Sequence, residues 1–123
     1  MKILAFIAVL VVALLHFGFL MLEMFYWDHE VGRSVFSMTP EMSAQTAVLA
    51  ANQGLYNGFL GAGLIWGLVS NKRDVVFLFL IFVIVAGVFG AATAKPSILF
   101  TQSLPAAIAF ILTLMARPGE GKS

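Results

Sequence analysis

The sequence predicts an all-α protein, and more narrowly a four-transmembrane-helix bundle that forms one integral membrane domain over residues 1–123. The first reason is composition: 61% of the residues are hydrophobic and 11% are charged, with a mean hydropathy of +1.00. A soluble domain of this size could not bury so much apolar surface. The second reason is length, because a span needs about 20 apolar residues, which leaves room for about four spans.

The first helix is expected over residues 3–27. The run from Ile3 to Leu22 has no charged residue, and Phe25, Tyr26 and Trp27 follow it as an aromatic belt at the headgroup level. The run is longer than the apolar part of a signal peptide, and no small-x-small cleavage site precedes the aromatic residues. We therefore expect a helix that is retained.

The second helix is expected over residues 40–70, after a loop over residues 28–39. Thr39 can cap the helix, Pro40 suits its first position, and Glu41 meets the positive end of the helix dipole. This helix is longer than the hydrocarbon core requires. Either its first turns stand above the membrane, or it tilts and bends near Gly54 and Gly58.

The third and fourth helices are expected over residues 75–94 and 98–116. With both termini in the cytoplasm, five basic residues lie inside and two lie outside. The inside group is Lys2, Lys72, Arg73, Arg117 and Lys122, and the outside group is Arg33 and Lys95. The positive-inside rule therefore predicts a multi-pass protein of the inner membrane with both termini cytoplasmic.

Composition also narrows the function. The chain has no cysteine, which excludes disulfides and thiolate metal sites. Its net charge is +1 and its basic residues are scattered, so nucleic acid is not an expected partner. Asp28, His29 and Glu30 are consecutive and lack the spacing of metal ligands, so no metal site is predicted. No phosphate loop or dinucleotide motif is present, and no cofactor is assigned.

Polar residues within the predicted spans fall almost entirely in the outer half of the membrane. Asn52, Gln53, Tyr56 and Asn57 lie within six positions of the second helix and cover about 140° of it, at 100° per residue. His16 and Glu23 are seven residues apart and share a face of the first helix. We expect one ligand-binding pocket from these six residues: His16, Glu23, Asn52, Gln53, Tyr56 and Asn57.

Two of the six residues can exchange protons. His16 and Glu23 are the candidate catalytic residues, since an ionisable group inside a span is a functional candidate and the other four offer only amides and a phenol. The structural alternative is that the polar side chains join helices, at roughly 0.6 to 2 kcal/mol per contact. On that interpretation His16 makes one interhelical hydrogen bond and Glu23 is a carboxylate at the headgroup level.

Several stretches of the chain together resemble a known family. They are Leu22-Glu23-Met24-Phe25-Tyr26-Trp27, Gly32-Arg33 with Phe36, Thr39-Pro40-Glu41, and the run from Leu49 to Phe59 with its Asn-Gln-Gly-x-Tyr-Asn core. They are similar to a family of small bacterial membrane proteins catalogued as domain of unknown function 1304. The resemblance covers essentially the whole chain. It implies a four-helix integral membrane protein of about this length, and it implies no activity, cofactor or substrate.

Three functions fit these observations. The first is binding of a small or lipid-like molecule in the polar pocket, with His16 or Glu23 as acid or base if the protein is an enzyme. The second is a proton-coupled small transporter acting as a homodimer, against which Glu23 lies at the end of a span instead of at mid-membrane. The third is an accessory or scaffold subunit whose polar face docks another membrane protein. The expected partners are accordingly the lipid bilayer, a small-molecule ligand and a second copy of the chain.

Overall fold

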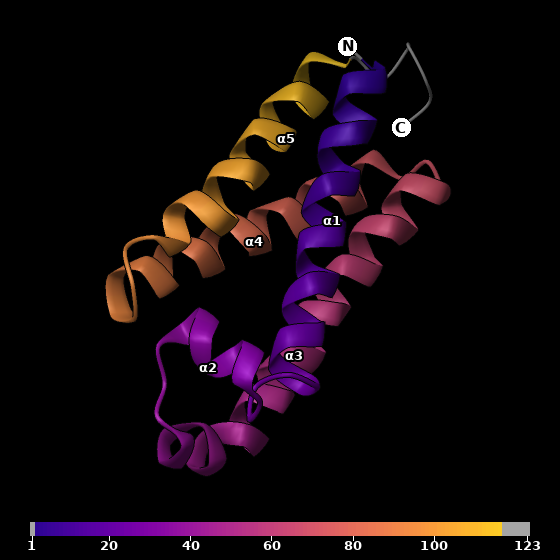
Figure 1. The fold of residues 1–123 in the computed structure, drawn as a ribbon. Coiled ribbons are helices and arrows are strands. Elements are labelled where there is room, and N and C mark those ends of the chain that lie inside the picture. The colour runs from indigo at the N-terminus through magenta and orange to yellow at the C-terminus, as the bar shows by residue number, and fades with distance from the viewer. Residues whose placement is uncertain (1, 117–123) are drawn as a thin grey trace. The chain divides into compact units, whose positions relative to one another are not determined.

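The structure, a computed structural model, describes residues 2–116 and confirms the all-α class (Figure 1). Its elements are α1 (Lys2–Met24), α2 (Glu30–Phe36), α3 (Pro40–Val69), α4 (Arg73–Thr93), the π-helical η1 (Leu99–Ser103) and α5 (Leu104–Met115). Of the basic residues counted for the orientation, Arg117 and Lys122 lie outside the described residues.

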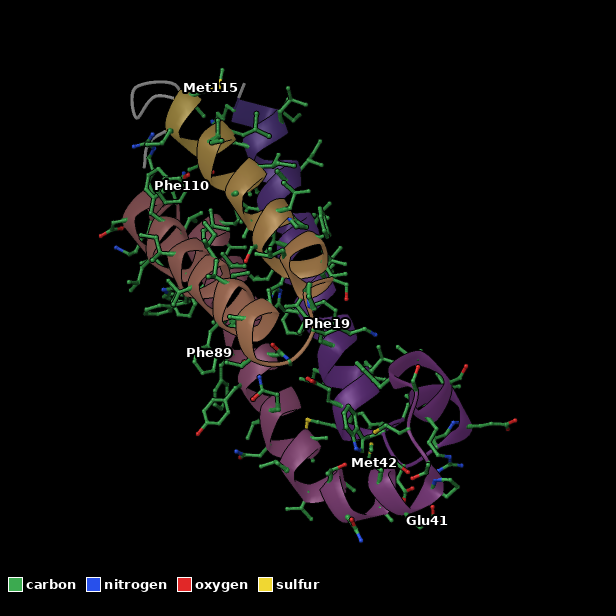
Figure 2. All side chains as sticks on the ribbon, turned by 90° about the vertical axis from the view of Figure 1, so that its left-hand side faces the viewer. Phe19, Glu41, Met42, Phe89, Phe110 and Met115 are labelled. Carbon is green, nitrogen blue, oxygen red and sulfur yellow. The ribbon has the colours of Figure 1, made fainter. Side chains whose placement is uncertain are left out.

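Two of these helices are long and apolar enough to cross a membrane. They are α1 and α4, and only 28% and 22% of their most apolar segments are buried. Figure 2 shows side chains that are mostly carbon along α4 and α5, including Phe89 and Phe110. The segment from Leu99 to Met115 is apolar but shorter. In α3, Asn52, Gln53 and Asn57 interrupt the apolar sequence, so this helix is less apolar than α1 and α4.

The described residues form two compact units, and each of α1 and α3 contributes to both. One unit consists of residues 15–61. It contains the second part of α1, the whole of α2 and the first part of α3. The other unit contains residues 2–14 and 62–116 of the described chain, with α4, η1 and α5.

The predicted loop over residues 28–39 contains a short helix, so that prediction was wrong for α2. The Nδ1 atom of His29 accepts a hydrogen bond from the backbone N–H of Val31 at 3.0 Å and caps the first turn. Ser37 ends the helix in the left-handed conformation, with φ 54°. The sequence shows neither signal strongly, because histidine is an uncommon cap and the left-handed residue is serine instead of glycine.

The chain turns after α1 earlier than expected, since the helix ends at Met24 and not near residue 27. Trp27 leaves the helix, and its indole N–H donates a hydrogen bond to Oγ1 of Thr46 in α3 at 2.9 Å. Its ring also packs on that of Phe36 in α2, with centroids 4.8 Å apart. The aromatic residue predicted for a membrane belt therefore joins three segments of this unit.

The start of α3 agrees with its sequence signals. The helix begins at Pro40, and Oγ1 of Thr39 accepts a hydrogen bond from the backbone N–H of Met42 at 3.1 Å. The cap at Thr39 is confirmed. Thr39 therefore ends the short connection from α2 and fixes where α3 begins.

In the second unit, α4 and α5 lie side by side (Figure 1). The guanidinium of Arg73, at the start of α4, donates hydrogen bonds to the carbonyl oxygens of Thr113 and Leu114 at 2.8 and 3.2 Å. These carbonyls are among the last of α5, where a helix lacks partners of its own. The same guanidinium lies 4.8 Å from the centre of the Phe77 ring.

The connection from α4 to α5 also departs from the single helix expected over residues 98–116. Pro105 has no N–H to donate to the carbonyl of Thr101, and the turn before it widens into the π-helical η1. Ser103 in η1 is buried and donates to the carbonyl of Ile84 in α4 at 3.0 Å. A Cβ at Gly87 would collide with Ser103, so glycine permits this contact.

Gly32 provides a test of the packing around α2. A Cβ at this position would lie 2.7 Å from the carbonyl oxygen of Trp27 and closer still to that of Tyr26, both backbone atoms that cannot rotate away. We expect Gly32→Ala to lower the free energy of unfolding by about 1 to 3 kcal/mol or more. Thermal unfolding of the purified protein in detergent measures the change.

The matched control is Gly18→Ala in α1, where a Cβ would meet nothing within 4 Å. It should be neutral or stabilising by up to about 1 kcal/mol, since alanine favours a helix over glycine. Equal effects of the two substitutions would contradict the described packing.

Candidate functional site

Two of the six predicted site residues meet directly. The side-chain amide of Asn57 in α3 donates a hydrogen bond from Nδ2 to Oε1 of Glu23, the penultimate residue of α1. Asn57 is only 5% exposed and Glu23 is partly buried. Both residues belong to the unit of residues 15–61. This bond between carboxylate and amide is the centre of the candidate site.

Helical periodicity places Asn57 on the side of α3 that faces α1. At 100° per residue, Asn57 shares this side with small residues that are also buried: Ala50, Gly54, Gly58 and Gly61. A Cβ at Gly54 would lie 2.8 Å from Cγ of Met24 and 3.0 Å from Cβ of Glu23. A Cβ at Gly58 would lie 2.5 Å from Cδ1 of Leu20. The missing side chains let the two helices approach closely enough for the bond to form.

The bond uses only part of the hydrogen-bonding capacity of the two side chains. Among residues 2–116, the only buried side-chain nitrogen or oxygen without a hydrogen-bond partner is Nε of Arg73. The second carboxylate oxygen of Glu23 and the amide oxygen of Asn57 make no hydrogen bond in this part of the chain. Neither atom is among the buried unpaired ones, so each keeps some solvent-accessible surface.

His16 is buried in α1, with 1% of its surface exposed. Its ring lies edge-on to that of Phe19, with centroids 5.3 Å apart. Glu23 follows seven residues later on the same face of the helix, about 10 Å further along its axis. That separation is too long for a direct hydrogen bond.

The other three predicted residues lie on the exposed surface of α3. Asn52, Gln53 and Tyr56 are exposed, Tyr56 to 54%. The ring of Tyr56 lies edge-on to that of Phe59 at 5.7 Å. Within the described part of the chain, the side chains of these three residues make no hydrogen bond. The shared pocket of six residues stays a prediction.

A polar network in the same unit was not predicted. Oδ1 of Asp28 accepts hydrogen bonds from the guanidinium of Arg33 at 3.0 Å and from Oγ of Ser43 at 2.8 Å. Ser43 is fully buried, and it lies in the first turn of α3. The opposite charges five residues apart gave a weak signal, but nothing in the sequence distinguishes Ser43 from the other serines.

No group of three or more His, Cys, Asp or Glu residues that could hold a metal ion is found over residues 2–116. The polar groups that meet at the site are the carboxylate of Glu23 and the amide of Asn57. Together they can bind a polar group by hydrogen bonds, and Glu23 can exchange a proton.

Removing the amide of Asn57 tests this site. In Asn57→Ala, the carboxylate of Glu23 loses its only hydrogen-bond partner in the described chain. We therefore expect the free energy of unfolding to fall by about 1 to 3 kcal/mol. The matched control is Asn52→Ala on the exposed side of α3, which should stay within about 0.5 kcal/mol of the wild type. Unfolding by heat or denaturing detergent measures both, and equal losses would contradict the assignment.

Comparison with known proteins identifies the family. The family described as "Protein of unknown function (DUF1304)" matches residues 10–114. A protein of Lactococcus lactis subsp. lactis described as "Uncharacterized protein YpaA" is 36% identical over 115 residues, which cover 90% of this chain and 97% of that protein. No solved structure matches the chain. The family match and the relative together show that this chain belongs to the DUF1304 family.

Proposed function

We propose that the protein spans the inner membrane four times and binds a small or lipid-like molecule at the Glu23–Asn57 pair. The membrane part is supported by α1 and α4, which are long, apolar and largely unburied. At 1.5 Å per residue, the 30 residues of α3 extend about 45 Å, which is longer than the hydrocarbon core of a bilayer, about 30 Å thick. The apolar segment from Leu99 to Met115 would be the fourth span, near the lower limit of length.

The orientation is supported by charge. Five basic residues against two favour a cytoplasmic location for both termini. On this orientation α1 runs outward, and Glu23 lies at its outer end. Water reaches carboxylates at this level more readily than at the centre of the bilayer.

The observation that carries the binding function is the partly used hydrogen-bonding capacity of the pair. A pair that served only to join the helices would be fully satisfied, because unpaired polar atoms are costly in a membrane. Glu23 and Asn57 instead keep two oxygen atoms accessible. The apolar side chains of Leu20 and Met24 lie against Gly54 and Gly58, on the side of α3 that also carries Asn57. Few polar groups in apolar walls are typical of sites for small ligands.

A second candidate function, as a subunit of a larger membrane complex or a homodimer, is supported by the exposed side of α3. Asn52, Gln53 and Tyr56 make no hydrogen bond within the described chain. Amide side chains in a span are costly unless another helix or water satisfies them. The transporter alternative has less support, since Glu23 lies at the end of α1 and not near its middle.

Single-cysteine labelling tests the orientation, and the chain has no native cysteine to interfere. Ser34 in α2 and Lys72 before α4 are both exposed. In intact cells, a membrane-impermeant maleimide should label Ser34→Cys and leave Lys72→Cys unlabelled until the cells are opened. The reverse pattern would contradict the orientation.

Co-purification tests the binding function. The protein is extracted in mild detergent, and small molecules that remain bound are identified by mass spectrometry. We expect a compound that the wild type retains and that is reduced about tenfold or more in Glu23→Gln, which keeps a polar partner for Asn57. Gln45→Ala, an exposed residue of α3 outside the site, is the control and should retain the compound. The same set of compounds in all three proteins would contradict the proposed site.

A further inference from the structure

The accessible oxygen atoms of the site are hydrogen-bond acceptors. The free oxygen of Glu23 and the amide oxygen of Asn57 can only accept hydrogen bonds while the carboxylate is ionised. The one donor left is the second N–H of the Asn57 amide. The complementary group is therefore rich in donors, as an ammonium or a hydroxyl group is.

The charge of the surrounding unit favours the ammonium. Residues 15–61 hold four carboxylates and one guanidinium, a formal net charge of −3. The carboxylates are Glu23, Asp28, Glu30 and Glu41, and the guanidinium is that of Arg33. Arg33 already pairs with Asp28 at 3.0 Å and lies within hydrogen-bonding distance of Ser43. No lysine or second arginine of this unit is left to neutralise Glu23.

The surroundings also favour a ligand with an apolar part. Leu20 and Met24 line the contact with α3 beside the pair. Both side chains are only half-buried, so part of their apolar surface stays exposed. A water-soluble ion would gain nothing from these surfaces, whereas the tail of an amphiphile would be removed from water.

From these three observations we propose that the ligand of the Glu23–Asn57 pair is an amphiphile with a primary ammonium group. The ammonium donates to the free oxygens of Glu23 and Asn57, and the tail lies along the apolar surface of α1 and α3. This inference rests on the proposed binding function and names the class of its ligand. The ammonium can belong to a free alkylamine or to the headgroup of an aminophospholipid.

Calorimetric titration of the full chain in nanodiscs of phosphatidylcholine tests the ligand class. Four short-chain probes are compared at neutral pH: octylamine, dihexanoyl phosphatidylethanolamine, octane-1,2-diol and octanoate. Empty nanodiscs give the blank for partition into lipid. We expect at least one of the two ammonium probes to bind about tenfold to a hundredfold more tightly than the diol and octanoate. Preference for octylamine identifies a free amine, and preference for the phospholipid identifies a headgroup.

Matched variants separate a specific site from general attraction by charge. Glu23→Gln and Glu41→Gln remove the same charge from the same unit. Only Glu23→Gln replaces the free carboxylate oxygen of the site, an acceptor, by an NH2 group, which is a donor. The ammonium preference should be lost in Glu23→Gln and kept in Glu41→Gln. Equal loss in both variants, or retention in Glu23→Gln, would overturn the proposal.

The remaining outcomes distinguish the ligand class from the binding function. If the diol or octanoate binds most tightly and its binding depends on Glu23, the site stands and the ammonium proposal fails. If no probe binds above the blank and no compound co-purifies in a Glu23-dependent manner, both proposals fail.

Discussion

The close approach of α1 and α3 at Gly54 and Gly58 is the constraint on which the unit of residues 15–61 depends. A Cβ at Gly54 would press on Cβ of Glu23 and on the backbone of α1, and one at Gly58 would displace the end of the Leu20 side chain. A wider spacing of the helices would separate Asn57 from Glu23. The glycines cost helix propensity, because glycine is less favourable than alanine in a helix by roughly 0.5 to 1 kcal/mol. What they make possible is a hydrogen bond between a carboxylate and an amide at the edge of an apolar helix.

Away from this contact, hydrogen bonds between polar side chains join the start of α3 to α2 and to the residues that follow α1. Trp27 bonds to Thr46, and the carboxylate of Asp28 links Arg33 of α2 to Ser43 of α3. Figure 2 shows nitrogen and oxygen atoms gathered near Glu41 and Met42, where α3 begins. Hydrogen bonds with charged partners are stronger than neutral ones. The bonds of Asp28 with Arg33 and Ser43 therefore compensate for the small apolar area that α2, a helix of seven residues, can bury.

In the other unit, glycines again allow close contacts between helices, and an arginine side chain joins two of them. Gly67 and Gly87 remove side chains where α3 meets α4 and where α4 meets η1. Arg73 supplies hydrogen bonds to the last carbonyls of α5. Large apolar side chains remain exposed on these helices, such as Phe89 at 69% and Ile111 at 55%. A lipid environment would surround such residues without cost, since lipid tails are as apolar as the side chains.

The sequence by itself determined the features that depend on local properties. Apolar runs and the Thr39-Pro40-Glu41 signal were enough for the all-α class and for the approximate positions of the long helices. The family followed from the resemblance of particular stretches, above all the Asn-Gln-Gly-x-Tyr-Asn core. These features are local because hydropathy and helix capping involve residues that are close in the chain. The choice of Glu23 and Asn57 as polar candidates also came from the sequence, as polar residues within apolar runs.

Only the tertiary structure decided which candidates meet. The sequence has two similar glycine pairs in α3, yet Gly54 and Gly58 pack on α1 while Gly63 and Gly67 pack on α4. That difference turns Asn57 towards Glu23 and leaves Asn52, Gln53 and Tyr56 exposed. The tertiary structure also buries Ser43, which the sequence does not single out, beside Asp28. The physical reason is that the facing side of a helix depends on which neighbour approaches it, and that choice involves residues far apart in the chain.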